Sequence, residues 1–211
     1  MRRYTLASLL LSAMLLWGCA HTVLVPVPPR VDLAGYRTIG IVDFSANAEP
    51  ALGARAARLM EEHVQAAQPG TRVVELGSRD WVLGSVGSPQ LDAAALKKIG
   101  AKYSVDAIFV GDLAYAEPRT DVRVIDVAKL EGAVKTELRA DISSRLLETA
   151  SGASVWSRSA WAKRQIGNVS VSERGVSGGM RDPNPREAML PGLVYQLTYD
   201  FRPGTVRKRV D

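Results

Sequence analysis

The side chains that could catalyse a reaction are few and far apart in the sequence. Asp43, Asp106 and Asp112 stand near the ends of apolar segments expected to be strands, where the sites of α/β proteins form. Capping and turn formation are the more common roles of such aspartates. His63 lies in an expected helix and is the only histidine besides His21, so neither a Ser-His-Asp set nor a set of metal ligands can be assembled. The sequence therefore predicts no catalytic residue, no metal and no cofactor.

A single cysteine, Cys19, offers a different kind of chemistry. Two arginines and an uncharged stretch at 6–17 precede it, and this stretch is too short for a stable bilayer anchor, as in a secretory signal. The segment Leu16-Trp17-Gly18-Cys19 resembles the lipobox of bacterial lipoproteins, whose cysteine carries acyl chains. The resemblance implies a signal peptide at 1–18 and binding to membrane lipid through the acylated Cys19. The alternative is ordinary cleavage after Ala20, which gives a soluble periplasmic protein.

The residue after the cysteine bears on the destination of the protein. Ala20 is not aspartate, and in the sorting pattern of lipoproteins from enteric-type bacteria this implies transfer to the outer membrane. Acyl chains contribute about 0.8 kcal/mol for each buried CH₂ group, so several of them together hold a protein stably on a membrane. The expected localisation is that of an outer-membrane lipoprotein that faces the periplasm.

Charge and length bound the rest of the chain. Of the 27 basic and 22 acidic residues, two arginines and no acid lie within 1–18, so the mature chain is only mildly basic, which argues against nucleic acid as a partner. The 211 residues suffice for one domain with a sizeable core. We expect a signal peptide at 1–18, a lipidated tether at 19–34, a single α/β periplasmic domain at 35–203 and a basic tail at 204–211.

Both ends of the mature chain are expected to lie outside that domain. Three prolines among the valines of 20–34 favour an extended tether. Alternatively, Val23, Val25 and Val27 add an edge strand, where prolines are tolerated. The basic residues at 207–209 are expected in a solvated tail, or else against anionic lipid or wall polymer.

Hydrophobic periodicity assigns the elements of the first half. Residues 38–44 are β-branched and apolar, as in a central strand that is covered on both faces. Residues 50–67 repeat apolar side chains at helical spacing. Further strands are expected at 72–76 and 105–113, and further helices after Ser78 and between Ser88 and Gly100.

The second half alternates apolar and polar residues, as antiparallel strands with one exposed face do. Residues 135–163 predict a hairpin that is longer than usual and turns at Ser151-Gly152. Residues 166–185 hold many glycines and polar groups, which predicts a mobile loop, and a last helix is expected from Pro185 or Pro191. The predicted fold class is α/β, with a single mixed β-sheet, helices packed on it and a long antiparallel hairpin in the second half.

Two tryptophans of this hairpin are candidates for binding a partner. Trp156 and Trp161 are five residues apart, so on one regular strand they face opposite sides of the sheet. At least one of them is exposed unless another element or protein covers it. A buried tryptophan packs in the core, whereas an exposed one can anchor an interface. Arg139 and Arg145 on the expected partner strand complete this candidate binding set.

Three segments carry a resemblance to known proteins, namely 38–44 with Asn47, 99–111, and 148–156. In their order and spacing they resemble envelope lipoproteins related to the curli secretion channel subunit. That superfamily includes the outer-membrane activators of penicillin-binding proteins and the amino-terminal domain of the Tol system's propeller protein. The resemblance implies the α/β fold and leaves the function open.

The sequence predicts a non-enzymatic outer-membrane lipoprotein that acts as an accessory, regulator or assembly factor by binding another envelope protein, such as a cell-wall synthase. One alternative is a homo-oligomeric export channel subunit of the curli-secretion type. Arg139, Asp141 and Arg145 argue against it because charges are costly on a lipid-facing strand, although a ring with these charges in its lumen keeps it open. The other alternative is a soluble periplasmic binding protein or hydrolase, for which no convergent polar site can be assembled.

Overall fold

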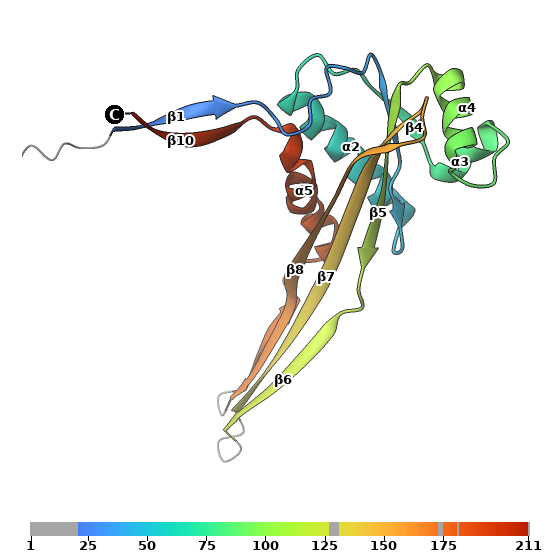
Figure 1. Ribbon diagram of the computed structural model, residues 1–211. Coiled ribbons are helices and arrows are strands. Elements are labelled where there is room, and N and C mark those ends of the chain that lie inside the picture. The colour runs from blue at the N-terminus through green and yellow to red at the C-terminus, as the bar shows by residue number, and fades with distance from the viewer. Residues whose placement is uncertain (1–20, 127–130, 173–174, 181, 211) are drawn as a thin grey trace, which may run out of the picture. The chain divides into compact units, whose positions relative to one another are not determined.

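The computed structural model of the protein describes residues 21–126, 131–172, 175–180 and 182–210 (Figure 1). These residues form two compact units. We call residues 30–202 the domain, and residues 21–29 with 203–210 the terminal ribbon. The expected signal peptide at 1–18 and Cys19, with the cleavage positions beside it, lie outside the described residues.

Strands and helices alternate in the first half of the domain, whereas the second half consists mostly of strands. The strands are β2 (Ile39–Val42), β3 (Ser45–Ala46), β4 (Val73–Gly77), β5 (Ala107–Tyr115), β6 (Arg119–Asp126), β7 (Glu131–Glu148), β8 (Ser154–Ser172) and β9 (Gly175–Met180). The helices are α2 (Pro50–Ala67), α3 (Arg79–Ser85), α4 (Ala93–Tyr103), α5 (Pro185–Leu197) and the 3-10 helix η1 (Thr198–Phe201). Among the described residues, no helix is long and apolar enough to cross a membrane.

The strands form one mixed sheet in the order β4-β2-β5-β7-β8-β9, with β3 beside β5 and β6 beside β7. Strands β4, β2 and β5 are parallel, whereas β5, β7, β8 and β9 pair antiparallel in turn. The α/β prediction is therefore confirmed: a single mixed sheet carries packed helices, and β7 with β8 forms the long antiparallel hairpin.

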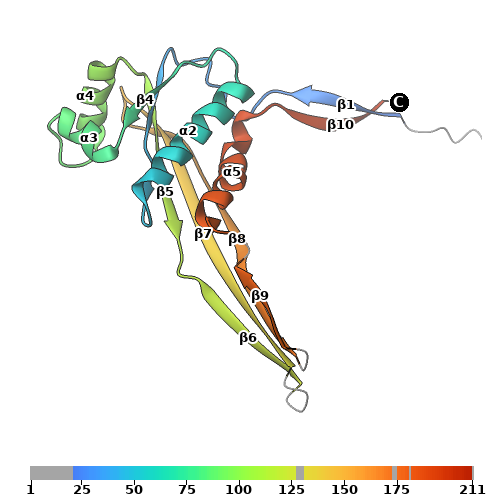
Figure 2. The same cartoon turned by 180° about the vertical axis from the view of Figure 1, so that it is seen from behind.

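The main core lies between the sheet and helices α2 and α5, which cover one of its faces (Figure 2). All four residues of β2 are buried because this strand is central and covered on both faces. Phe109, Trp156 and Phe201 pack their rings against one another beneath α5 and η1, with centroids 4.7 to 6.0 Å apart. Edge-to-face and tilted aromatic pairs of this kind stabilise a core beyond the area that they bury.

A smaller core lies on the opposite face, where α3 and α4 cover β2, β4 and the beginning of β5. Helix α3 begins after its predicted cap, Ser78, whose hydroxyl accepts a hydrogen bond from the Trp81 amide at 3.3 Å. The predicted start of the next helix at Ser88 is wrong. Helix α4 begins later, at Ala93, where the Asp92 carboxylate accepts the Ala95 amide at 2.8 Å and caps the helix.

Four strands continue beyond the helices and form what we call the arm: β6, β9, and residues 131–137 of β7 with 165–172 of β8 (Figure 1). The prediction of a mobile loop at 166–185 is therefore wrong for most of its length. Gly178 explains part of the error, because a Cβ at this position would lie 2.0 Å from the Asn168 carbonyl oxygen. Its glycine serves the close approach of two strands rather than a loop.

The arm has one apolar and one polar face. Cross-strand pairing aligns Val122 with Val134 and Val134 with Val169, so these valines share a face. The same face continues toward the domain core through Leu138. The opposite face carries the charged and polar side chains Arg119, Asp121, Arg123, Lys135, Glu137, Asn168 and Ser170.

The terminal ribbon consists of β1 (His21–Val27) and β10 (Gly204–Val210), which pair antiparallel along their whole length. The segment expected as a tether and the segment expected as a basic tail thus pair with each other. Neither interpretation of 20–34 is observed as predicted: residues 21–27 form a strand and not a free tether, but this strand pairs with the C-terminal segment and not with the sheet of the domain.

Candidate docking surface

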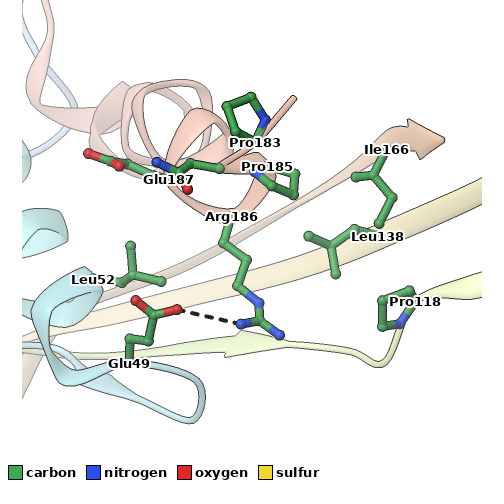
Figure 3. Close-up of a pocket in the computed structure, with 10 residues that line it drawn as sticks. Glu49, Leu52, Pro118, Leu138, Ile166, Pro183, Pro185, Arg186 and Glu187 are labelled. Carbon is green, nitrogen blue, oxygen red and sulfur yellow. Dashed lines mark ion pairs between the residues drawn. The ribbon is translucent and has the colours of Figure 1, made fainter. Parts of the chain in front are cut away.

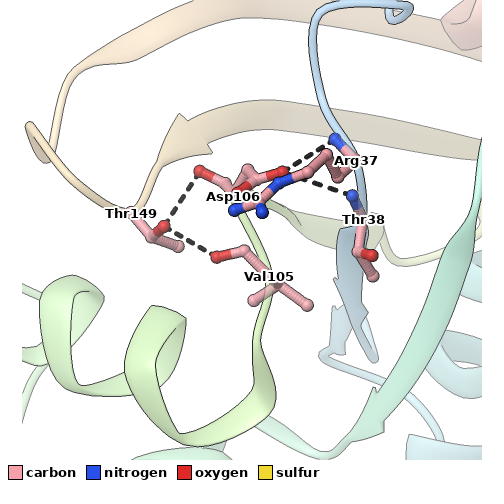
Figure 4. Close-up of polar contacts among 5 residues, drawn as sticks. All are labelled: Arg37, Thr38, Val105, Asp106 and Thr149. Atoms are coloured by element: carbon pink, nitrogen blue, oxygen red, sulfur yellow. Dashed lines mark hydrogen bonds and ion pairs between the residues drawn. The ribbon is translucent and has the colours of Figure 1, made fainter.

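The three aspartates considered for catalysis lie in separate environments. Asp106 accepts hydrogen bonds from the Arg37 amide at 2.7 Å and the Thr38 amide at 3.3 Å, and pairs with the Arg37 guanidinium at 3.3 Å (Figure 4). These hydrogen bonds, led by that of the Arg37 amide, lower the pKa of Asp106. The Thr149 hydroxyl donates to the Val105 and Asp106 carbonyl oxygens. Asp106 thus ties the chain that enters β2 to the start of β5, which is a structural role.

This cluster also gives a physical reason for the family resemblance. Thr38, Asp106 and Thr149 belong to the three resembling segments, one to each. Figure 4 shows them meeting at one end of the sheet. The hydrogen bonds of Asp106 and Thr149 therefore join parts of the three segments that are far apart in the sequence.

Asp43 and Asp112 do not join Asp106. Asp43 lies near Glu75 and Arg58, and burial followed by the charge of Glu75 raises its pKa. Asp112 pairs with Arg79 of α3 at 3.2 Å, on the face of the sheet opposite α2. Within the described ranges, no three His, Cys, Asp or Glu side chains gather as metal ligands.

His63 occupies a structural position on α2. Its ring lies edge-on to Tyr195, with centroids 6.0 Å apart. Burial, and then the charge of Arg202, lowers the pKa of the imidazole. The histidine therefore contributes to packing between α2 and α5.

An open part of the sheet lies beyond α3 and α4, over β7 and β8. Register places Asp141 opposite Trp161, Ser143 opposite Ser159 and Arg145 opposite Ser157, so these side chains share one face. Trp161 is 57% exposed, which is unusual for so large an apolar group. We call this surface the open face, and it brings together three of the four residues of the predicted binding set: Trp161, Arg139 and Arg145.

Arg139 links the aromatic and charged parts of the open face. Its guanidinium forms two hydrogen bonds with Asp141, at 2.7 and 2.9 Å, and lies 5.4 Å from the centre of the Trp161 ring. The hydrogen bonds from Arg139 lower the pKa of Asp141, so the carboxylate stays ionised and the bidentate pair persists. Trp161 is thereby held in place before any partner arrives.

The neighbouring part of the open face is hollow and polar. A cavity of about 380 Å³ is lined by Asp112, Ser143, Arg145, Ser157 and Ser159, among others. Arg145 is exposed and has no ion-pair partner in the described part of the chain. A free guanidinium beside three hydroxyls suits a carboxylate or another anionic acceptor on a binding partner.

Trp156 lies on the other face, as the spacing of five residues predicts. It is 7% exposed, and its indole nitrogen donates to Asp200 at 3.2 Å. The Asp200 carboxylate also pairs with Arg158 at 2.7 Å. Trp156 therefore belongs to the core and is not accessible to a partner.

A second cavity was not predicted by the sequence. It has a volume of about 350 Å³ and lies where the body of the domain meets the arm (Figure 3). Leu52, Leu138 and Ile166 form its apolar wall, and Arg186 pairs with Glu49 at 3.6 Å across its rim. Because its residues come from α2, α5, β7 and β8, no local pattern could have indicated it. Its walls suit an apolar group rather than acid–base chemistry.

Asn47, which belongs to the first resembling segment, holds the end of β5. The Asn47 side chain donates to the Tyr115 carbonyl at 3.0 Å and accepts the Tyr115 amide at 2.9 Å. The Tyr115 hydroxyl donates to the Arg186 carbonyl at 2.9 Å, and burial raises its pKa to about 12. Asn47 thus fixes the end of β5, and Tyr115 joins that end to α5.

No family model matches the sequence, and no curated protein matches it. Solved structures do show a similar course of the chain. The PelC dodecamer from Paraburkholderia phytofirmans is 14% identical, with 86% of this chain and 98% of that chain covered and a TM-score of 0.41. A lipoprotein from Neisseria meningitidis is 14% identical over 61% and 83% of the two chains, with a TM-score of 0.36.

The C-terminal domain of LpoB from Salmonella enterica is 11% identical over 65% of this chain and 84% of that one, with a TM-score of 0.29. Of the three, the protein from Neisseria meningitidis is described as a lipoprotein. At these identities and TM-scores, the likeness says nothing about what this chain binds.

Proposed function

We propose that this protein is a non-enzymatic lipoprotein of the outer membrane, anchored through acylated Cys19, that acts as an accessory or assembly factor by binding another envelope protein. The signal sequence and the lipobox-like segment support the anchor. The open face of the sheet supports the binding. The domain faces the periplasm in this arrangement.

The observation that carries the proposal is the exposed Trp161 on the open face. Tryptophan and arginine are enriched among the residues that dominate interface energies. Trp161 is already held by Arg139 and Asp141, so its ordering on binding costs little. Arg145 lies four residues along β7 from Asp141, the partner of Trp161, or about 13 Å along the same face, and supplies a cation for an acidic group. The partner is accordingly an envelope protein that presents an apolar pocket about 13 Å from a carboxylate, and a cell-wall synthase is the class that we favour.

Site-specific photo-crosslinking in cells tests this assignment. A photoreactive amino acid replaces Trp161 in one strain and Trp81 in another, because Trp81 is also exposed, at 68%, but lies on α3. We expect one defined crosslinked protein from position 161 and none from position 81. Trp161→Ala should weaken its binding at least about 30-fold, as for other interface hot spots. Equal crosslinking from both positions would contradict the proposal.

The anchor is tested separately. Mass spectrometry of the mature N-terminus and membrane fractionation compare the native chain with Cys19→Ala. We expect an acylated Cys19 in the outer membrane, and loss of membrane attachment in the variant. A soluble native chain that begins at His21 would overturn the anchor and favour the periplasmic binding protein.

One observation favours the channel alternative as a second candidate. The arm is amphipathic. The charged residues Arg139, Asp141 and Arg145 lie outside the arm, in the part of β7 that belongs to the body of the domain. Strands β6 and β9 are its two edges and run antiparallel to each other, so β6 of one copy can pair with β9 of the next. Arg123→Cys combined with Ser177→Cys tests this in a chain whose native Cys19 is replaced, because Arg123 and Ser177 lie at the same level and on the same face of the arm. Disulfide-linked ladders indicate a ring or filament, and a monomer excludes this pairing.

A further inference from the structure

The terminal ribbon has a charge pattern that the docking surface does not explain. Its two strands, HTVLVPV and GTVRKRV, contain three Lys or Arg residues and no acidic residue. Arg207, Lys208 and Arg209 are all exposed. Such a pattern suits a negatively charged surface.

The register places this basic segment next to the N-terminal end of β1. Arg209 pairs with Thr22, and Arg207 pairs with Leu24. Cys19 precedes Thr22 by three residues, and a fully extended chain spans at most about 3.6 Å per residue. Thr22, which pairs with Arg209, therefore lies within about 11 Å of Cys19. The pairing of β10 with β1 therefore holds the basic residues 207–209 near the N-terminal anchor, although they lie at the other end of the sequence.

The ribbon also offers apolar side chains beside these charges. Arg207 and Arg209 lie on the same face as Leu24, which is 65% exposed. Lys208 shares the other face with Val23, which is 45% exposed, and Val206, which is 49% exposed. Cations next to exposed aliphatic groups are typical of segments that lie at a lipid headgroup layer.

We propose that the terminal ribbon is a second membrane contact that binds the anionic phospholipid headgroups around the lipid anchor. The inference rests on the proposed acylation of Cys19, which brings the ribbon to the bilayer. One anchor plus a basic patch is a common pair of membrane signals. The ribbon would then fix the point at which the chain leaves the membrane.

The expected contribution follows from the charges. Each basic residue near an anionic membrane contributes about 1 kcal/mol, which is about a fivefold change in affinity. Asp211 follows the strand in the sequence and opposes one of the three charges. The remaining two therefore give about a 25-fold preference for anionic over neutral membranes.

Vesicle flotation of the unacylated mature chain tests the ribbon independently of the anchor. The protein is residues 19–211 with Cys19→Ser, and the vesicles are phosphatidylcholine with or without phosphatidylglycerol. We expect about 25-fold tighter binding to the anionic vesicles, and loss of that preference when Arg207, Lys208 and Arg209 are all replaced by Gln. Raising the ionic strength to about 1 M should abolish it too, because the Debye length falls to about 3 Å.

A charge-matched control separates position from net charge. Arg72→Gln, Lys97→Gln and Lys98→Gln remove three exposed charges from the domain and should leave vesicle binding within about twofold of the parent. Asp211→Asn should tighten binding about fivefold. Equal weakening by both triple variants, or no preference of the parent for anionic vesicles, would overturn the inference. Neither result bears on the acylation of Cys19, which mass spectrometry decides.

Discussion

The same two strands, β7 and β8, pass through a body covered by helices and an arm without helices. In the body, the β7 side chains that face α5 include Leu138, Ile142 and Leu146, which are at most 1% exposed. In the arm, the matching face carries Val122 and Val176, which are 68% and 72% exposed. Apolar and polar residues alternate in a similar way in both regions. This alternation sets which side of a strand is apolar, whereas the packing of a helix decides whether that side is buried.

The two regions therefore draw on different sources of stability. The body gains from apolar burial, at about 25 cal/mol for each Å² removed from water. The arm relies on backbone hydrogen bonds and cross-strand pairs, which contribute about 0.2–1 kcal/mol each. Regions with few buried contacts open locally at a lower free energy than the core does. The arm is thus expected to open while the body stays folded.

The largest difference between body and arm is expected for truncation of an apolar side chain. Phe201→Ala removes the ring that packs 4.7 Å from Trp156, between centroids, and should lower the free energy of unfolding by about 3–5 kcal/mol. Val122→Ala in the arm should change it by less than about 0.5 kcal/mol. Urea unfolding followed by tryptophan fluorescence measures both. Similar losses for the two variants would remove the distinction between the regions.

The next largest effect is expected for a glycine of the body that lies in close contact with a neighbouring backbone atom. A Cβ on Gly53 of α2 would lie 1.9 Å from the Phe44 carbonyl oxygen, so Gly53→Ala must push the helix off the sheet and should cost about 1–3 kcal/mol. Gly84 in α3 faces open space, and Gly84→Ala should stabilise the domain by up to about 1 kcal/mol. Thermal unfolding compares them, and a neutral Gly53→Ala would mean that α2 is loosely packed.

The equivalent contact in the arm should have a local effect only. Gly178 has a φ of 124° and would place a Cβ 2.0 Å from the Asn168 carbonyl oxygen, so Gly178→Ala should separate β9 from β8. Hydrogen exchange should accelerate at least tenfold in β9, which corresponds to about 1.4 kcal/mol, without change in β2 or β5. Loss of protection throughout the sheet would show that body and arm unfold together.

The smallest effect concerns charge at the edge of the body. Burial, and then the charge of Glu75, raises the pKa of Glu61. A carboxyl with a higher pKa in the folded state binds its proton more tightly when folded, so stability falls as the pH rises through the window between the unfolded and the raised value. Glu61→Gln should therefore stabilise the domain near about pH 7, by less than about 1 kcal/mol because solvent screens the group, and not below about pH 4.

Unfolding curves at both pH values measure this difference. Glu117→Gln, at an exposed position beside the arm, serves as the control and should leave the pH profile unchanged. A gain for Glu61→Gln that is as large in acid as near neutral pH would show that the charge of Glu61 is not its cause.

Local patterns predicted those features whose physical cause is local. The helix at 50–67, the cap at Ser78 and the opposite orientations of Trp156 and Trp161 follow from periodicity and short-range hydrogen bonds. The pairing of β1 with β10 could not be predicted, because the basic strand has no apolar alternation and its partner lies at the other end of the chain. The glycine-rich composition likewise concealed strand β9, in which Gly178 allows close contact with β8.

The candidate site likewise has parts that follow from local sequence patterns and parts that depend on tertiary packing. Side chains alternate between the two faces along β7 and β8, and the register of a hairpin keeps paired residues on one face. This alternation placed Trp161, Arg139 and Arg145 on one surface. The hollow beside Arg145 is lined by three strands, β5, β7 and β8, and the cavity near Arg186 depends on four elements. Such concavities arise from tertiary packing and leave no periodic signal.

The continuity of β7 and β8 has a mechanical consequence. Strand β7 runs for 18 residues, or about 60 Å, without leaving the sheet, and β8 follows it for almost the same length. A force on the distal end of the arm is therefore carried along covalent chains and hydrogen-bonded ladders directly past Trp161. The register irregularity opposite Thr136 and Glu137 lies where the arm begins. A load on the arm therefore reaches the open face along two unbroken strands.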